Sequence, residues 1–534
     1  MNKTLLTLGE IQAIHQAGRL DEAKHACEAY LASHPKDAYA LHFYGILQAE
    51  AGNDGQARQV LEEAVALQPD EPSFKLHLAN ICKAFGDDVE AIQMLTALCD
   101  QHPDFAPAYN NLGTLYDAAK DYSKAINAYK IAINLQSNYL DAYYNLGLAL
   151  NKANQMEGAM HAYEALLALA PKHAGGRFQT GLLWMKQRKF QEAMTAFAQL
   201  EADYPFHFET QANLAACALQ LGQLTQAKAH YLKALDIKPE DAETHYNLGV
   251  INMHQGFFKE AIRFYQRALA IHPDLFEAHN NLGIVYMSLR DTQSALIHFR
   301  AALRAQPDQV AVRHTIQVLT GEKNVTSSPP EYICSLFDAY AANYDAHLVK
   351  SLNYQVPARL YQLLVETVAD PVPVWEVLDM GCGTGLCGER FRPYARQLTG
   401  VDLSEKMLAI AAQKNCYDVL IKAEVLAYLQ AQASHYDLVV AGDVLVYFGA
   451  LEALFAAVSA VLKPHGWFLF NVECGKDKPF AITETGRFTH TLAYLERLAA
   501  THRFSFERHA VEILRTQDQA ATSGHLCLLR AKMS

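Results

Sequence analysis

A repeat of 34 residues is the feature that most constrains how this 534-residue chain can fold. Alanine recurs at every 34-residue step from Ala23 to Ala295 without a break. Proline keeps the same step, with Ser137 in one position, and stands at Pro35, Pro69, Pro103, Pro171, Pro205, Pro239, Pro273 and Pro307. A period of this length predicts stacked structural repeats that contact only their neighbours, rather than one compact core.

A small residue and a large residue repeat at the same interval. The small residues are Gly45, Ala79, Gly113, Gly147, Gly181, Ala215, Gly249 and Gly283. The large residues, four positions after the alanines, are Leu61, Leu95, Tyr129, Tyr163, Phe197, Tyr231, Tyr265 and Phe299. Two helices can cross closely only where one side chain is small, and the large side chain fills the space beside it. Proline then ends the second helix because it cannot continue the hydrogen-bond ladder.

This pattern closely resembles the tetratricopeptide repeat (TPR) family over residues 4 to about 307. The resemblance implies an all-α solenoid over residues 1–320. We expect nine repeats, the first of them degenerate, with Ile11 in the small-residue position, and a capping helix over 308–320.

The pattern changes after residue 320. Residues 321–330 (GEKNVTSSPP) contain turn formers without apolar periodicity, which predicts a linker between two domains. Over residues 331–534, short apolar runs alternate with helical segments, which is typical of a parallel α/β sheet. The expected strands are 374–379, 398–402, 418–423, 437–442, 466–472, 506–514 and 525–530. The last two leave no room for a crossover helix, so we expect them to pair antiparallel.

The first of these strands runs into a glycine-rich loop, VLDMGCGTGLCG, over residues 377–388. Gly381, Gly383 and Gly385 permit positive φ angles and let the backbone approach a ligand at the start of the next helix. Asp379 stands at the strand end, and Asp402 ends the next strand 21 residues after Gly381. A carboxylate at that place can bind ribose hydroxyls, which predicts a nucleoside-containing cofactor.

The glycine run, together with VDLSEKML at 401–408 and the LKPH turn at 462–465, resembles the class I S-adenosylmethionine-dependent methyltransferases. The resemblance spans about 331–534 and implies a Rossmann-like, seven-stranded, mostly parallel sheet with an antiparallel last strand. It also implies S-adenosylmethionine as cofactor. The residues that the resemblance assigns to the cofactor are Asp379, Gly381, Cys382, Gly383, Gly385, Asp402, Leu403, Glu424 and Asp443.

Within that set the resemblance places the glycines and Asp379 at the methionine moiety, and Asp402 with Leu403 at the ribose. Glu424 would face the adenine, and Asp443 would line the methyl-transfer side. A strand-end acid such as Asp443 also serves often as a helix N-cap, which stays open as an alternative.

Two other functions fit parts of the pattern. Residues 383–388 match a dinucleotide fingerprint, which leaves a nicotinamide-dependent oxidoreductase as one alternative. The other is a TPR scaffold whose methyltransferase domain binds cofactor without catalysis. Asp379 favours the methyltransferase, since a dinucleotide fingerprint has no need of an acid there.

Candidate catalytic residues lie outside the glycine loop. Residues 336–347 resemble a lid segment of TPR-containing bacterial methyltransferases, so Tyr340 or Tyr344 could cover the cofactor; a packed amphipathic helix is the alternative. Arg487 or His490 could orient an acceptor or take its proton, although a lone histidine is more often only solvated. The Asn/Asp-Pro-Pro-aromatic motif is absent after the fourth strand, which disfavours methylation of DNA bases or glutamine. The acceptor itself stays open.

One position in the first helix of each repeat carries an amide. This row consists of Asn111, Asn145, Gln179, Asn213, Asn247 and Asn281. It resembles the asparagine ladder in the TPR superhelix of O-linked N-acetylglucosamine transferases, which implies a protein or peptide partner held by its backbone in the groove. Asparagine is also common at this place in TPR sequences for packing reasons alone.

Charge and cysteine content limit the partners and the compartment. Acidic residues outnumber basic ones 57 to 45, for a net charge of −12, so we expect no nucleic-acid partner. The ten scattered cysteines form no CxxC pair, which predicts thiols in a reducing compartment and no metal site. Neither a signal peptide nor a membrane span is expected, which predicts a cytoplasmic protein. The sequence does not define an oligomeric state.

Overall fold

The computed structural model describes residues 6–322, 325–341, 344–346, 348, 352, 354–368, 374–432, 436–483, 485–517 and 520–533. The chain falls into two compact units, Met1–Thr244 and His245–Ser534, each of which is considered by itself. The division lies within a repeat helix, Ala242–His254, because repeats contact only their neighbours and any step along them is crossed by few contacts. The boundary predicted at 321–330 stays a prediction.

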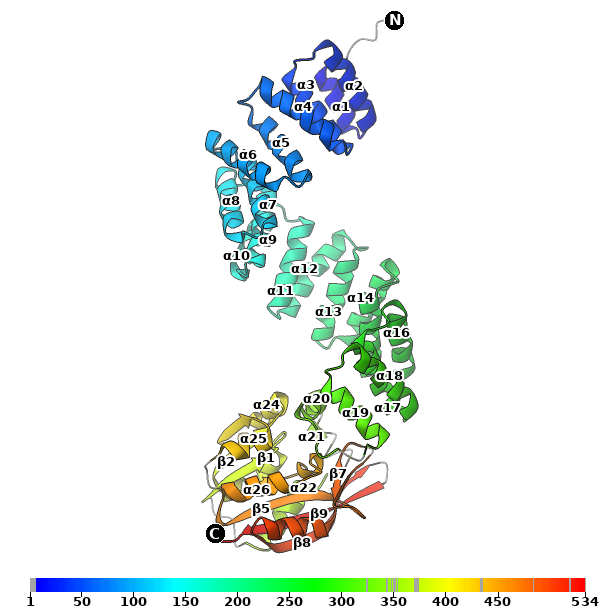
Figure 1. Ribbon diagram of the computed structural model, residues 1–534, viewed down its shortest axis with the longest axis vertical. Coiled ribbons are helices and arrows are strands. Elements are labelled where there is room, and N and C mark those ends of the chain that lie inside the picture. Colours follow the sequence, from blue (N-terminus) through cyan, green and yellow to red (C-terminus); the bar gives the residue numbers. More distant parts are fainter. Residues whose placement is uncertain are drawn as a thin grey trace. The chain divides into compact units, whose positions relative to one another are not determined.

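The first nineteen helices of the chain form the repeat array, and eighteen of them form nine antiparallel pairs (Figure 1). The first unit holds α1 (Leu8–Gln16), α2 (Leu20–Ser33), α3 (Ala38–Glu50), α4 (Asp54–Leu67), α5 (Pro72–Ala84), α6 (Asp88–Gln101), α7 (Ala106–Ala118), α8 (Tyr122–Leu135), α9 (Leu140–Lys152), α10 (Met156–Leu169), α11 (Ala174–Lys186), α12 (Phe190–Asp203), α13 (Phe208–Gln220) and α14 (Leu224–Ile237). From α15 (Ala242–His254) onward follow α16 (Phe258–Ile271), α17 (Phe276–Ser288), α18 (Thr292–Ala305) and α19 (Val310–Thr320). The predicted helical solenoid is confirmed.

The contact between the small and the large residue joins the two helices of each pair. A Cβ atom built on Gly147 of α9 would lie only 2.4 Å from Cε1 of Tyr163 in α10, and one on Gly249 would lie 2.5 Å from Tyr265. Tyr163 and Tyr265 are fully buried. The glycine therefore gives the ring its space, and the two positions form one packing unit.

The turn between the paired helices has its own period. A residue with positive φ occurs in all nine of these turns, at Gly18, Gly52, Gly86, Lys120, Asn154, Arg188, Gly222, Gly256 and Arg290. Glycine adopts this left-handed conformation without steric cost, whereas Lys120, with φ 60°, adopts it because the helices on both sides impose it. These nine positions follow one another at the same 34-residue step as the alanines and prolines.

The second unit contains the sheet. Its strands are β1 (Trp375–Met380), β2 (Ala395–Asp402), β3 (Val419–Lys422), β4 (Tyr436–Ala441), β5 (Leu462–Cys474), β6 (Phe480–Ile482), β7 (Phe488–His490), β8 (Phe504–Gln517) and β9 (Ala520–Ala531). Its helices are α20 (Pro330–Tyr340), α21 (Tyr344–Ala346), α22 (Val356–Val365), α23 (Leu386–Phe391), α24 (Glu405–Gln413), α25 (Val425–Ala431), α26 (Glu452–Val461) and α27 (Leu492–Thr501).

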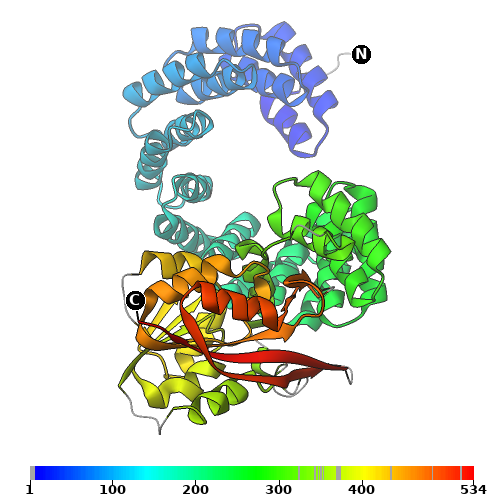
Figure 2. The same cartoon turned by 60° about the horizontal axis from the view of Figure 1, so that its bottom comes forward.

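The strand order confirms the predicted fold class. Strands β3, β2, β1, β4 and β5 pair in parallel in that order, and β9 pairs antiparallel with β5 on one side and with β8 on the other. Figure 2 shows the long antiparallel pair of β8 and β9 in red. All seven predicted strands are present, and β8 and β9 form the expected antiparallel pair. The two short strands β6 and β7 were not predicted, because no apolar run marks them in the sequence. Strand β7 pairs with Glu473 and Cys474, on the edge of β5 that β4 leaves unpaired beyond Phe470.

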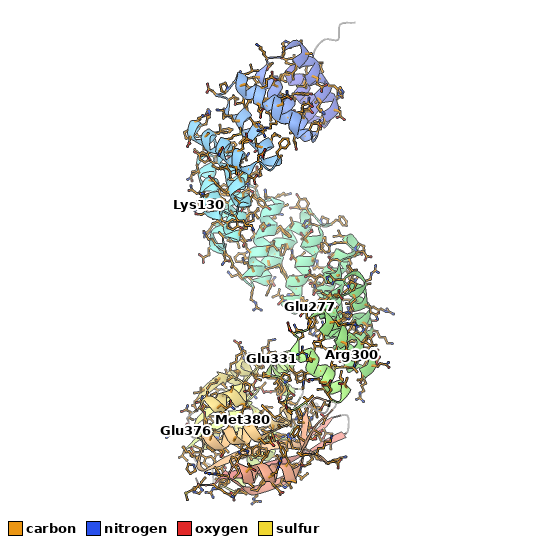
Figure 3. All side chains as sticks on the ribbon, viewed as in Figure 1. Lys130, Glu277, Arg300, Glu331, Glu376 and Met380 are labelled. Carbon is orange, nitrogen blue, oxygen red and sulfur yellow. The ribbon has the colours of Figure 1, made fainter. Side chains whose placement is uncertain are left out.

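Both faces of the sheet are covered. Leu378 and Val439 face a core shared with α25, α26 and α27, whereas Val377 and Val440 face a second core shared with α22 and α23. Neighbouring residues of β1 and β4 thus point to opposite cores, which explains why Val377 and Leu378 of β1 and residues 438–441 of β4 are all apolar. Figure 3 shows Met380 at the end of β1, where the chain leaves the sheet for the glycine loop.

Where the structure describes it, the segment predicted as a linker pairs with the loop that follows β4. Ser327 forms an antiparallel bridge with Phe448, and the N–H of Ser328 donates to the carbonyl of Tyr447 at 2.8 Å. The N–H groups of Gly449 and Ala450 both donate to the carbonyl of Thr326. Residues 326–330, here called the connecting segment, are therefore held against the loop that follows β4.

In the described parts of the chain, no helix is both long and apolar enough to cross a membrane. Nor do the described residues contain a group of three or more His, Cys, Asp or Glu side chains placed to hold a metal ion.

Candidate functional site

The glycine loop joins β1 to α23 through three residues with positive φ. The φ angles are 67° at Gly381, 53° at Gly383 and 91° at Gly385. A Cβ atom on Gly381 would lie 2.4 Å from Cγ2 of Val444, so the backbone passes where a side chain would clash. A Cβ atom on Gly383 would meet nothing within 4 Å, which leaves that side of the loop open to a ligand.

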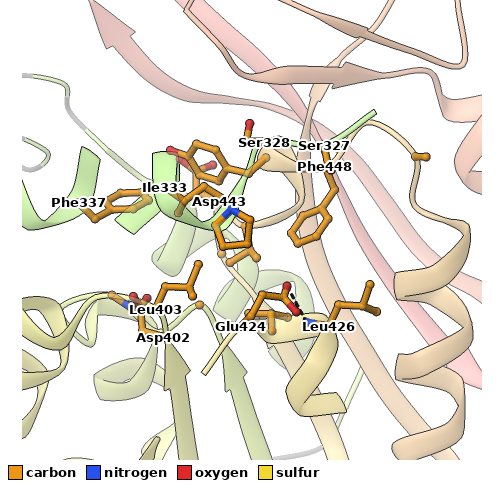
Figure 4. A pocket seen from close by; sticks show the side chains of 18 of the residues that line it. Ser327, Ser328, Ile333, Phe337, Asp402, Leu403, Glu424, Leu426, Asp443 and Phe448 are labelled. Atoms are coloured by element: carbon orange, nitrogen blue, oxygen red, sulfur yellow. Dashed lines mark hydrogen bonds between the residues drawn. The ribbon is translucent and has the colours of Figure 1, made fainter. Parts of the chain in front are cut away.

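A cavity of about 300 Å³ opens at the carboxyl ends of the parallel strands, beside this loop (Figure 4). Its lining comes from segments that are distant in sequence: Thr326, Ser327, Ser328, Pro330, Ile333, Phe337, Tyr344, Gly381, Gly383, Asp402, Leu403, Glu424, Val425, Leu426, Gly442, Asp443, Val444, Tyr447, Phe448 and Ala450. In Figure 4, Ile333 and Phe337 lie across the cavity from Asp402, Leu403 and Glu424. This edge of an open α/β sheet is where such folds bind their ligands.

Asp402 connects the first two strand ends. Its Oδ2 accepts the N–H of Gly383 at 2.9 Å, and its Oδ1 accepts the N–H of Ser404 at 2.8 Å. Burial raises the pKa of Asp402, while these backbone hydrogen bonds act in the opposite direction. Each oxygen retains acceptor capacity toward the cavity. The side chain therefore holds the glycine loop in place and can still accept hydroxyl groups.

Glu424 lines the cavity at the end of β3, but its carboxylate also caps a helix. Oε1 accepts the N–H of Leu426 at 2.9 Å, and Oε2 accepts that of Ala427 at 2.6 Å. These bonds satisfy two of the unpaired N–H groups at the start of α25. The N-cap alternative weighed for Asp443 thus applies to Glu424.

Asp443 lies in the lining as part of a buried charge network. Its φ of 61° is unusual for a residue other than glycine, and Asn471 holds it there by accepting its N–H and donating to its Oδ1, both at 2.8 Å. Arg487 Nη2 lies 2.9 Å from Asp443 Oδ2, and Arg515 Nη1 lies 3.8 Å from it. Burial alone would raise the pKa of Asp443, but the two arginines outweigh it and lower this pKa. The carboxylate is therefore ionised.

The same arginines also pair with Glu473 of β5. Arg487 Nε lies 2.5 Å and Arg515 Nη2 2.8 Å from Glu473 Oε1. Two acids and two bases thus balance in a buried network, of which only Asp443 lines the cavity. Breaking one partner of such a network is costly, so we expect it to hold the loop after β4 rigidly.

Asp379 and Cys382 are buried and do not line the cavity. Asp379 is 2% exposed and accepts the hydroxyl of Tyr417 at 2.6 Å, beneath the glycine loop. Burial raises the pKa of Asp379 to about 7, with the Tyr417 hydrogen bond opposing. The N–H of Cys382 donates to the carbonyl of Val401, which ties the loop to β2. Gly385, the N-cap of α23, also lies outside the lining.

The structure disagrees with the catalytic role predicted for His490. This residue is fully buried on β7, its Nε2 lies 3.0 Å from the carbonyl of Gly449, and it does not line the cavity. Burial lowers its pKa to about 4. Arg487 is likewise behind the lining. The wrong interpretation arose because β7 is too short to be recognised as a strand.

The predicted lid is described in part. Tyr344 lines the cavity, and burial raises its pKa well above the ordinary value. Asn343, His347 and the side chain of Tyr340 lie outside the described residues. Tyr447, Phe448 and the connecting segment also form the site, yet sequence reasoning missed them. Their one signal was the aromatic pair that follows the fourth strand.

The amide row lies on the first helices of the repeats, half-buried at all six positions. Three of its members make hydrogen bonds to the preceding repeat: Asn111 donates to Asn80 at 2.8 Å, Asn145 to Asn110 at 3.2 Å, and Asn281 to Tyr246 at 3.2 Å. These bonds support the packing explanation for half of the row. The other three are Gln179, Asn213 and Asn247.

Comparisons with known proteins agree with both parts of the chain. The family described as "Methyltransferase domain" matches residues 377–466, which include the glycine loop, Asp402 and Asp443. Families described as tetratricopeptide or TPR repeats match 15–81, 55–116, 110–174, 177–207, 219–256 and 240–308.

Two curated proteins are similar over part of their length. The "Biotin biosynthesis bifunctional protein BioHC" of Saccharophagus degradans is 28% identical over 175 residues, 30% of this chain and 31% of that protein. The "Malonyl-[acyl-carrier protein] O-methyltransferase" of Erwinia pyrifoliae is 33% identical over 95 residues, 18% of this chain and 34% of that protein. The chain thus spans about a third of each relative. Among solved structures, YrrB, titled a TPR protein with an unusual peptide-binding site, is 21% identical, covers 35% of this chain and 97% of its own, and has a TM-score of 0.33.

Proposed function

Because the chain joins tetratricopeptide repeats to a methyltransferase domain, we propose that it transfers a methyl group from S-adenosylmethionine to an acceptor that the repeats bring to the domain. The observation that carries the proposal is the common cavity of the glycine loop and Asp402. An open backbone face beside a strand-end carboxylate fits a nucleoside joined to an amino acid chain.

Each part of the lining has a proposed role. Gly381 and Gly383 would lie along the methionine moiety, and Asp402 with Leu403 would hold the ribose hydroxyls. Glu424 would face the adenine. Each of its carboxylate oxygens already accepts one backbone N–H and could accept a further hydrogen bond from the adenine. Asp379 and Cys382 would act beneath the loop by fixing its conformation, since neither reaches the cavity.

The bound cofactor would supply a methyl group on a sulfonium, which is electrophilic without further activation. The protein's task is then to place a nucleophile in line with it and to exclude water. The apolar side chains of Ile333, Phe337, Val444 and Phe448 make much of the wall, which supports a dry site. Asp443, ionised and held by Asn471, is placed to orient an N–H or O–H group of the acceptor.

The repeats would bind a polypeptide in extended form. The support is the amide row. Because Asn111, Asn145 and Asn281 are bonded to the preceding repeat, we expect Gln179, Asn213 and Asn247 to make the main contacts with the peptide. An amide can pair with a peptide group of any sequence because it both donates and accepts.

Calorimetry on the full chain separates this function from the two alternatives. We expect S-adenosylmethionine to bind and NADH not to bind; the reverse result would favour the oxidoreductase. Catalysis is then tested by incubating the chain and labelled cofactor with lysate of a strain that lacks the gene. Cofactor binding without any transferred label would favour the non-catalytic scaffold.

A further inference from the structure

One turn of the array departs from the pattern that the other turns keep. In eight of the nine turns that follow the second helix of a repeat, the residue after the proline position carries a charge or an amide. These residues are Lys36, Asp70, Asp104, Asn138, Lys172, Glu240, Asp274 and Asp308. In the sixth of these turns, between α12 and α13, the same position holds Phe206 (Figure 1). The sixth turn therefore carries an aromatic ring where the other turns carry a polar group.

The packing of the array does not account for this ring. Phe206 is 86% exposed, the largest value among the large apolar residues described, and Tyr204, on the other side of Pro205, is 50% exposed. Two aromatic side chains that stay in water forgo the free energy that burial would supply. A pair of this kind indicates a surface that another molecule covers.

An apolar pocket lies beside the sixth turn. It has a volume of about 440 Å³ and is lined by Ala174, Gly175, Phe178, Leu200, Tyr204, His207 and Glu209. Gly175 is the second residue of α11, a position at which α9 and α13 carry Asp141 and Glu209. The sixth repeat thus lacks a side chain at a point where both flanking repeats have one, and the pocket opens there.

The wall of the pocket is fixed from behind. The ring of Phe178 packs edge to face against the buried Phe197 of α12, with ring centroids 5.7 Å apart, and against His207 at the same distance. The imidazole of His207 also accepts the N–H of Thr210, which caps α13. The walls are therefore ordered before a ligand enters, which lowers the entropic cost of binding.

The charge beside the pocket is negative. Apart from His207, the one acidic or basic side chain in the lining is Glu209, which is exposed. Two bases of the same repeat are already paired, since Arg177 Nη1 and Lys172 Nζ lie 2.7 Å and 3.9 Å from the carboxylate of Asp203. An acid in the first turn of a helix also stabilises that helix, so we expect Glu209 to set a preference for basic ligands rather than most of the affinity.

We propose that this pocket, with Tyr204 and Phe206 at its edge, binds a large apolar side chain of a polypeptide whose neighbouring residues are basic. The proposal rests on the part of the proposed function in which the repeats bind a polypeptide. Phe178 of the lining directly precedes Gln179 of the amide row, so one bound segment can reach both. The amide row would hold its backbone without regard to sequence, and the pocket would select one of its side chains.

The test begins with a phage library of short random peptides selected on the full chain. We expect the enriched peptides to share a large apolar residue, such as Leu, Phe or Trp, with Lys or Arg close to it. The commonest sequence is then synthesised with a fluorescent label, and its affinity is measured by anisotropy. Replacing its apolar residue by Ser should weaken binding about tenfold, because one large side chain is no longer buried.

An exchange of turns shows where the peptide binds. Tyr204→Gln with Phe206→Asn gives the sixth turn the residues that the fourth turn has at Gln136 and Asn138, with which the array already folds. This double variant should bind the labelled peptide about tenfold more weakly and keep its helical circular dichroism. Gln136→Ala with Asn138→Ala is the control, since it changes the same positions of another turn and should leave the affinity unchanged. Glu209→Gln should weaken binding about threefold and reduce its dependence on ionic strength.

The contrary outcomes separate the pocket from the proposed function. If no peptide is enriched, polypeptide binding by the repeats fails together with the pocket, whereas cofactor binding is judged separately by calorimetry. If the enriched peptides bind the turn-exchange variant as tightly as the unmodified chain, the repeats bind peptides elsewhere and the pocket is not the site. If those peptides are acidic or share no large apolar residue, the ligand chemistry proposed here is wrong.

Discussion

The repeats and the α/β domain place their important contacts at very different distances along the chain. In the repeats, Gly147 makes room for Tyr163, 16 residues later, and the same pair recurs in the next units. In the α/β domain, one cavity collects residues from Thr326 to Ala450, and the network behind it reaches Arg515. A contact that repeats at a fixed interval can be recognised in a single sequence. When a site is built from distant segments, the sequence reveals only those site residues that belong to a known motif.

The difference also appears in how each region is stabilised. A repeat depends on a small residue at one position, so a side chain added there would overlap the aromatic ring of the paired helix. The site depends on hydrogen bonds from backbone N–H groups to Asp402 and on ion pairs around Asp443, so its variants should change binding before they unfold the chain. The following variants test that contrast.

The largest effect is expected from Gly147→Val in the repeats. Its Cβ would overlap Tyr163, whose buried ring has no other space, so the free energy of unfolding should fall by about 3 kcal/mol. Gly55→Ala is the control, since a Cβ there meets nothing within 4 Å and alanine favours the helix. Denaturant titration followed by circular dichroism measures both. Equal stability of the two variants would show that the glycine–ring contact does not determine packing.

In the site, Asp402→Ala should weaken binding of S-adenosylmethionine by roughly 1–3 kcal/mol, because the N–H groups of Gly383 and Ser404 lose their acceptor. Asp402→Asn should cost less, since its amide oxygen still accepts one of them. Calorimetry gives the affinities, and Glu405→Ala, an exposed change on the adjacent helix α24 outside the lining, serves as the control. An unchanged affinity in Asp402→Ala would remove Asp402 from the proposed cofactor site.

A third experiment uses the buried Asp379. An unfolded aspartate has a pKa near 3.9, whereas Asp379 has a pKa of about 7 in the folded chain, so between these values the folded state holds a proton that the unfolded state has lost. Stability therefore falls as the pH rises through this interval. The side chain in Asp379→Asn cannot titrate. The free energy of unfolding of this variant, relative to that of the wild type, should therefore increase by about 1.4 kcal/mol from pH 5 to pH 6. Urea titrations at both pH values measure the gain; parallel changes would contradict it.

The smallest effects are expected in the amide row. Replacing both Asn213 and Asn247 by Ala should weaken a polypeptide acceptor by about 0.5–1.5 kcal/mol for each amide and leave cofactor binding unchanged. Asn145→Ala should instead lower the stability, since Asn145 is bonded to Asn110. Methyl transfer to the acceptor found with labelled cofactor is the measurement. Unchanged turnover in the double variant would mean that the repeats do not present the substrate.

Sequence reasoning was most successful where geometry follows from local pattern. The helical pairs, the seven main strands and the fold class were predicted because each has a recognisable period in the sequence. The period is 34 residues for the repeats, about 3.6 for a helix and two for a strand. Gly381, Gly383, Asp402, Leu403, Glu424 and Asp443 were expected near one another, and the cavity lining contains all six. What they bind stays a prediction.

The rest depends on contacts that have no period. Glu473 and Arg515 belong to β5 and β8, and only the pairing of β5 with β9 and of β9 with β8 brings them together. His490 looked available because a three-residue strand carries too little pattern to reveal its burial. Asp379 was expected in the cavity because strand-end position alone cannot tell an exposed acid from one covered by the loop above it.

The bridge between Ser327 and Phe448 determines where the α/β domain can be separated from the repeats without loss of its cavity. An α/β domain excised at residue 331, where regular patterning begins, would lack Thr326, Ser327 and Ser328 and so lose one wall of its own cavity. Gly321, with φ 67°, ends α19 five residues before that wall and marks a better place to divide the chain. A graft of this domain onto a different array would therefore have to include residues 321–329, which precede α20.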